Sequence, residues 1–355
     1  MNEVLVKRIA DAVLYEGYIL YPYRPSVKNR QRWTFGGLYP RSYSEAQEGS
    51  DAWAVQTECL VQGGEHTVLQ VKVRFLHLLA RLVGQLECPV NELPDGAEPA
   101  FRVVERLRIG ERLLHTWQEA VERECLLGDL DLPTLAAGPR RREFAFPARR
   151  ELEPVRGPLG EIAAVLVREQ QAVAGGIEVS AEPAAERLFK VRVRVENRSP
   201  LEDAGQRSRD EALLHALIST HIVLVVREGA FVSLADPPEE WRAIAASCKN
   251  CGTWPVLVGE AGEKDTLLSS PIILYDYPQI APESPGDLFD STEIDEILTL
   301  RILTLTDEEK QAAAAVDERV RILLQRTECL ANEQLLGLHG TVRGLRAAPA
   351  EVGYE

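Results

Sequence analysis

The chain has 355 residues, of which 45% are hydrophobic and 27% charged, an ordinary globular composition that excludes wholesale disorder and leaves room for two domains. Its formal net charge of −15 argues against nucleic acid as a partner, because phosphate binding requires clustered cations. No segment approaches the ~20 consecutive apolar residues of a membrane helix, and the first residues lack the pattern of a secretory signal peptide. Six cysteines, four of them isolated, fit a reducing compartment. We therefore expect a cytoplasmic protein without membrane insertion.

The N-terminal region combines a predicted helix with an aromatic and basic segment. Residues Val4–Tyr21 place apolar side chains, including Ile9 and Leu14, on roughly one helical face. Residues 18–43 then interleave aromatic rings with Arg and Lys, residue types that are typical of protein interfaces. The alternative is a loop whose rings anchor it to the body while its charges stay in solvent. The candidate partner-binding residues are Tyr21, Tyr23, Arg24, Arg32, Trp33 and Phe35.

Residues 51–127 alternate between apolar and polar side chains, the period of half-buried strands. A strand ending at Val61, the pair Gly63–Gly64 and a returning strand Thr67–Leu79 together predict a hairpin. After a loop at Cys88–Pro99, further strands are expected on either side of a turn at Gly110.

A second set of strands follows a Pro-, Gly- and Arg-rich stretch at 128–160, which reads as a connection. The predicted strands are Ile162–Gln170, Gly176–Pro183, Leu188–Asn197, His221–Val226 and Ala230–Leu234, the last two separated by a turn at Glu228–Gly229. Between them, Ser208 is positioned to cap a short helix that carries Leu213 and Leu217. Since edge strands of such a sheet can pair between copies, a homodimer is compatible with this pattern.

The C-terminal region is expected to be helical, with a capping box at Thr306–Glu309 and helix to about Leu338. The predicted fold class is therefore α+β, an antiparallel β-rich body with flanking helices and a helical C-terminal portion. The expected divisions are an N-terminal segment with a first β-rich part (1–130), a second β-rich part (131–240), an α-rich C-terminal part packed on the body (241–345) and a frayed tail (346–355).

Cys248 and Cys251 form a CxxC pair, the strongest candidate for chemistry in this sequence. Such a pair supplies half of a zinc or iron–sulfur site, whose remaining ligands would be scattered residues such as His215, His221 or Cys329. The alternatives are dithiol redox chemistry and a purely structural turn. No phosphate-binding loop, dinucleotide fingerprint, serine nucleophile elbow or zinc-hydrolase helix is present in the sequence, so no catalytic residue is predicted and no cofactor beyond zinc or iron at this pair.

Two stretches carry a resemblance to a known family. They are ADAVLYEGYILYPYRPSVKNRQRWTFG (10–36) and, after GTWPVLVG (252–259), LSSPIILYDYPQIAPESPGDLFDSTEIDEILTLRILTLTDEE (268–309). Together they resemble an uncharacterised bacterial protein family encoded beside the subunits of uptake nickel–iron hydrogenases. The resemblance implies an accessory role in hydrogenase assembly or maturation, with hydrogenase subunits or their precursors as partners. We expect a non-catalytic binding protein that uses the aromatic segment and the loop Pro271–Glu296; the alternative is a metal-binding or dithiol redox maturation factor that uses the CxxC pair.

Overall fold

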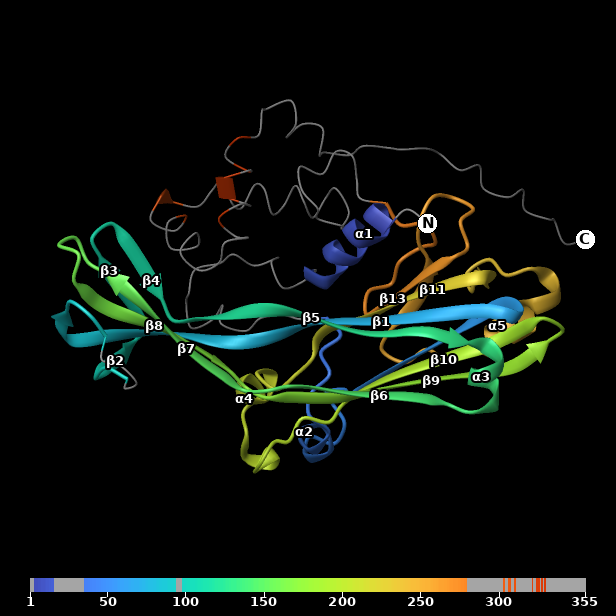
Figure 1. Cartoon of the computed structure of the whole chain (residues 1–355), viewed down its shortest axis with the longest axis horizontal. Coiled ribbons are helices and arrows are strands. Elements are labelled where there is room, and N and C mark those ends of the chain that lie inside the picture. The colour runs from blue at the N-terminus through green and yellow to red at the C-terminus, as the bar shows by residue number, and fades with distance from the viewer. Residues whose placement is uncertain are drawn as a thin grey trace, which may run out of the picture.

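A computed structural model describes residues 3–15, 35–93 and 98–279, together with single positions between 303 and 329. The fold is built on one strand, β1 (Ala54–Val90), which is 37 residues long and runs almost the full length of the molecule (Figure 1). Because β1 is so long, different strands pair with its successive parts, and it connects the two ends of the sheet.

The strands other than β1 are short or of medium length. They are β2 (Phe101–Val104), β3 (Arg106–Ile109), β4 (Arg112–His115), β5 (Trp117–Asp131), β6 (Arg140–Phe146), β7 (Arg149–Arg156), β8 (Ile162–Gln170), β9 (Val173–Ala185), β10 (Leu188–Asn197), β11 (Ile218–Val232), β12 (Trp254–Leu257) and β13 (Thr266–Ser270). An 11-stranded antiparallel sheet has the order β12-β13-β11-β1-β10-β9-β6, with β2, β5 and β8 also paired to β1 and β7 paired to β8; β3 and β4 form a separate hairpin. Strands from both predicted β-rich parts thus belong to one sheet.

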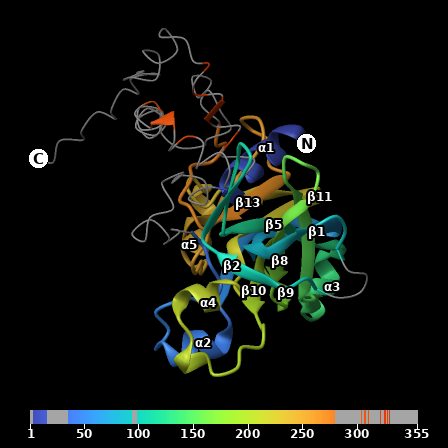
Figure 2. The same ribbon diagram turned by 90° about the vertical axis from the view of Figure 1, so that its left-hand side faces the viewer.

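Short helices flank this sheet. They are α1 (Glu3–Tyr15), α2 (Arg41–Ala46), α3 (Leu132–Ala137), α4 (Arg209–Leu213) and α5 (Arg242–Ala246), with 3₁₀ turns η2 (Ala204–Gln206) and η3 (Glu239–Trp241). The apolar face of α1 packs through Val6, Ile9 and Ala10 on β11, β12 and β13, as its sequence periodicity predicts. Helices α2 and α4 lie side by side below the middle of the molecule (Figure 2).

The predicted α+β class is wrong, because the protein is mostly β. Among the described residues, strands account for 54% and helices for 16%. Where the helical C-terminal portion was expected to begin, residues 241–279 contain the five-residue helix α5 followed by strands β12 and β13. The run from Thr266 to Ser270 is fully buried and pairs with β11, so tertiary pairing decides its conformation. The remainder of the predicted helical portion lies outside the continuous described ranges.

The predicted hairpin at Gly63–Gly64 is also wrong, because β1 continues through both glycines. The register of β1 against β11 shifts between Gly63 and Val68, which makes this site a β-bulge. Thr67 occupies the bulge: its Oγ1 accepts a hydrogen bond from Gly64 N at 2.8 Å and donates one to the carbonyl of Glu228 at 2.5 Å. A Cβ added at Gly63 would lie 2.4 Å from that hydroxyl. The predicted turn at Glu228–Gly229 is the opposite side of the same bulge, since Gly229 pairs with Gly63.

The stretch 128–160, predicted to be a connection, contains the end of β5, the helix α3 and the strands β6 and β7. These two strands run antiparallel to β9 and β8, so 140–156 and 162–179 form one long ribbon. Its arginines and prolines suit an edge strand, where charge and missing N–H donors oppose pairing with other chains. Composition alone did not reveal the strands because these edge features resemble those of a loop.

Candidate functional site

The CxxC segment closes an open edge of β1. At Ala54–Cys59, β1 pairs with β10 on one side, and β11 reaches the other side only from Leu60 onward. The gap is filled by the loop after α5: Gln56 and Cys251 exchange backbone hydrogen bonds of 3.1 and 2.9 Å. Asn250 Oδ1 accepts from both Thr57 Oγ1 and Glu58 N, each at 2.9 Å. The motif therefore satisfies strand backbone that would otherwise lack partners.

The Cys248 thiol lacks the lowered pKa of a reactive cysteine. Burial raises the pKa of Cys248 to about 11, whereas a reactive thiol needs a lowered pKa. Cys248 is half-buried and Cys251 is exposed, and both are free thiols. Their geometry matches the structural alternative that the sequence left open.

A metal centre at the pair would need further ligands from the fold. Within the described ranges, no group of three or more His, Cys, Asp or Glu side chains is arranged to hold a metal ion. Of the scattered ligands considered from the sequence, His221 is fully buried in β11 and its Nδ1 bonds the carbonyl of Ser219 at 3.0 Å. Cys329 is exposed. His215 is held near the junction of β8 and β9 by a hydrogen bond to the backbone of Ala172.

A segment that follows β13 presents apolar side chains to solvent. In the run from Ile272 to Tyr275, alternate residues face opposite ways. Ile272 and Leu274 pack against the cluster that α1 makes with β12 and β13, while Ile273 is 72% exposed and Tyr275 89% exposed. Because contiguous exposed apolar surface marks interaction sites, Ile273 and Tyr275 are the candidate contact residues of this segment. We call residues Pro271–Tyr277 the docking segment.

The docking segment is held at both ends. At its start, Ser270 Oγ donates to the carbonyl of Ile272 at 2.7 Å. At its end, the carboxylate of Asp276 accepts a hydrogen bond from Leu257 N at 2.8 Å, and Tyr277 N donates to the carbonyl of Leu257 at 2.7 Å. The Tyr277 hydroxyl also donates to the carbonyl of Glu263 at 3.0 Å. Ile273 and Tyr275 therefore lie in a segment whose end is hydrogen-bonded to Leu257 and Glu263.

Of the predicted partner-binding residues, Tyr21, Tyr23, Arg24, Arg32 and Trp33 lie outside the described residues. Phe35 is described and half-buried, and its carbonyl accepts a hydrogen bond from Ser219 N at 3.1 Å. The next residue, Gly36, contacts the docking segment so closely that an added Cβ would lie 2.4 Å from the Cβ of Pro271. The end of the aromatic segment and the start of the docking segment therefore meet, although 235 positions separate them in sequence (271 − 36).

Sequence reasoning selected the loop from Pro271 onward but not its individual contact residues. The run Pro-Ile-Ile-Leu-Tyr is uniformly apolar, so it has no alternation from which inner and outer positions could be told apart. The one sequence feature that pointed to this segment was an apolar run between a strand and a proline-rich loop.

Comparison with known proteins leaves the family resemblance without independent support. The chain matches no protein-family model, and no curated protein is significantly similar to it. Of the helices that the structure describes, none has the length and apolar character needed to cross a membrane.

Proposed function

We propose that this chain is a non-catalytic binding protein that assists the assembly or maturation of a nickel–iron hydrogenase by docking onto its subunits or their precursors. The observation that carries the docking part is the exposure of Ile273 and Tyr275 on a segment whose two ends are hydrogen-bonded. Two ordered apolar side chains can enter pockets of a partner without the entropy cost of fixing a flexible loop. The identity of the partner rests on the sequence resemblance.

The partner surface that complements this segment is apolar at its centre. Trp254, which is 41% exposed on the terminal strand β12, pairs in register with Ser270, next to the docking segment. Aromatic side chains of this kind are frequent in the energetically dominant part of protein interfaces. We also propose that the interaction takes place in the cytoplasm, which the sparse and mostly isolated cysteines of the sequence favour.

Co-purification with the hydrogenase subunits tests this proposal. The double variant Ile273→Ser/Tyr275→Ser should retain the circular dichroism spectrum and melting temperature of the wild type and lose most of the recovered subunit. The matched control is Leu159→Ser in the turn between β7 and β8, because Leu159 is 94% exposed on a different part of the surface. Undiminished recovery with the double variant would refute docking through this segment.

A further inference from the structure

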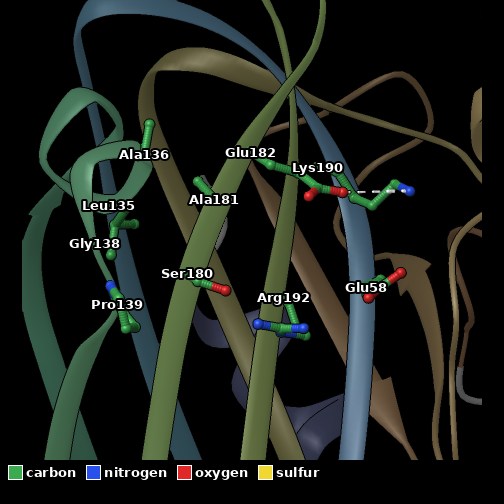
Figure 3. Close-up of a pocket in the computed structure, with 10 residues that line it drawn as sticks. All are labelled: Glu58, Leu135, Ala136, Gly138, Pro139, Ser180, Ala181, Glu182, Lys190 and Arg192. Carbon is green, nitrogen blue, oxygen red and sulfur yellow. Dashed lines mark ion pairs between the residues drawn. The ribbon is translucent and has the colours of Figure 1, made fainter.

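A small pocket lies where β9 extends beyond β6 at the edge of the sheet (Figure 3). Its volume is about 200 Å³. One row of strand residues across its floor is Glu58, Arg192 and Ser180, which are neighbours in register on β1, β10 and β9. The next row brings Lys190 beside Glu182. The corner between α3 and β6, residues 135–139, forms the opposite wall.

Most charges in this pocket already have partners. Lys190 Nζ lies 3.6 Å from Glu182 Oε1 and donates to Ser247 Oγ at 2.9 Å. Glu58 is buried and accepts a hydrogen bond from Lys249 N at 2.8 Å. Arg192 is different: with the residues that the structure describes, its guanidinium forms neither an ion pair nor a hydrogen bond.

Arg192 and Ser180 are arranged to act on one ligand. They are paired in register, so their side chains project from adjacent positions on the same face, and Figure 3 shows the Ser180 hydroxyl directed toward the Arg192 guanidinium. The Ser180 hydroxyl likewise has no partner among the described side chains and backbone. A planar guanidinium offers two parallel N–H donors, which match the two oxygens of a carboxylate.

We propose that this pocket binds a small monocarboxylate, with Arg192 forming a bidentate ion pair and the Ser180 hydroxyl donating to one of the carboxylate oxygens. A monoanion is favoured over a dianion because Arg192 is the one lining cation without a partner among the described residues, whereas Lys190 is already paired with Glu182. A second negative charge would face the two glutamates. The apolar atoms of Leu135, Ala136 and Pro139 suit a short aliphatic chain, and a volume below the roughly 300 Å³ of ordinary ligand pockets limits its size.

The carboxylate could belong to a free organic acid or to the C-terminus of a peptide, since both present the same group. This inference does not depend on docking through Ile273 and Tyr275, which lie in the segment after β13. Failure of one proposal therefore leaves the other intact.

The test is a titration of the full chain with propionate, followed by NMR of the arginine side-chain Nε–H signals. The Arg192 signal, identified by its loss in Arg192→Ala, should shift saturably with propionate. Inorganic phosphate at the same pH should bind at least 10-fold more weakly. Arg192→Lys keeps the positive charge but loses the two parallel N–H donors of the guanidinium. Isothermal titration calorimetry should therefore show propionate affinity reduced by about 10-fold.

The matched control is Arg112→Ala, which removes an exposed arginine from the β3–β4 hairpin and changes the net charge equally. Its propionate affinity should equal that of the wild type. A response that never saturates, or an affinity reduced equally in Arg112→Ala and Arg192→Ala, would overturn the proposal. In a second arm, the peptide Ala-Ala-Ala is compared with its C-terminal amide. If the free peptide binds at least 10-fold more tightly than propionate and the amide does not bind, the natural ligand is a peptide C-terminus. If the free peptide binds no more tightly than propionate, the natural ligand is a free acid.

Discussion

Arg74, buried in the middle of β1, donates a hydrogen bond from Nη2 to Oδ1 of Asp11 on α1 at 2.5 Å. Partial burial acts to raise the pKa of Asp11, but hydrogen bonds from Lys7 and Arg74 outweigh it and hold the pKa below its usual value. The pair therefore stabilises the folded state above pH ~4, and this contribution is lost as the pH falls through the lowered pKa of Asp11. The contact connects the N-terminal helix to the strand around which the fold is built.

Asp11→Asn should lower the free energy of unfolding by about 1–3 kcal/mol, because a buried guanidinium loses its closest charged partner while Glu122 remains at 3.4 Å. Urea denaturation at pH 7 measures the change. Lys7→Ala is the control, since Lys7 forms an exposed i,i+4 pair with the same carboxylate and should cost less than about 0.5 kcal/mol. Equal costs for the two variants would show that Arg74 does not depend on Asp11.

Two fully buried histidines predict a loss of stability in mild acid. Burial and the charge of Arg123 lower the pKa of His77 to about 4, and burial and Arg74 do the same for His221. The unfolded chain binds protons near pH 6.5 while the folded chain does not, so the free energy of unfolding should fall between pH 6.5 and about 4. The slope should approach about 1.4 kcal/mol per pH unit for each histidine. His221→Gln should reduce that slope, and a slope unchanged in this variant would contradict the prediction.

Asn250, between the two cysteines, should matter more to stability than either thiol. Its side-chain oxygen accepts from Thr57 and Glu58, so Asn250→Ala leaves two strand donors without partners and should cost about 1–3 kcal/mol. Cys251→Ser alters an exposed side chain and should cost less than about 0.5 kcal/mol. Thermal unfolding of both variants measures the difference. A larger loss in Cys251→Ser than in Asn250→Ala would show that the thiol has a role beyond this turn.

Local patterns predicted those elements whose local preference and tertiary environment agree. The alternation in Leu188–Asn197 gave strand β10 with its correct bounds, and Val191, Val193 and Val195 are fully buried. Ser208 and Glu211 form the capping box of α4. The incorrect predictions occurred where one sequence pattern is compatible with two local structures. Gly63 suits a turn or a bulge, and the choice depends on Thr67 and on the partner strand β11.

Gly36 is distant from the docking segment in sequence but contacts it in space, so a substitution there should disturb it. Its φ is +53°, and a side chain there would also collide with Pro271. Gly49 has φ of +78° with no atom within 4 Å of an added Cβ, so Gly49→Ala carries the backbone strain alone. Gly36→Ala should be more destabilising than Gly49→Ala by about 1–3 kcal/mol and should shift NMR signals of the docking segment. Equal destabilisation, with those signals unmoved, would contradict the packing of Gly36 against Pro271.

The candidate site could be predicted only as a region. Inner and outer residues of the docking segment differ because Ile272 and Leu274 pack against the cluster of α1, β11, β12 and β13, and this cluster joins residues far apart in the sequence. The pocket at Arg192 depends in the same way on three strands in register and on the corner after α3. Neither arrangement is encoded in the spacing of nearby residues.

Site-specific photo-crosslinking tests the docking proposal most directly. A photoreactive phenylalanine derivative is placed at Tyr275 in cells that produce the hydrogenase subunits, and at Leu159 in a parallel strain, since both positions are highly exposed. We expect a crosslink from position 275 to a hydrogenase subunit or its precursor, and none from position 159. Absence of that crosslink at position 275, with the protein and the subunits present at normal levels, would contradict it.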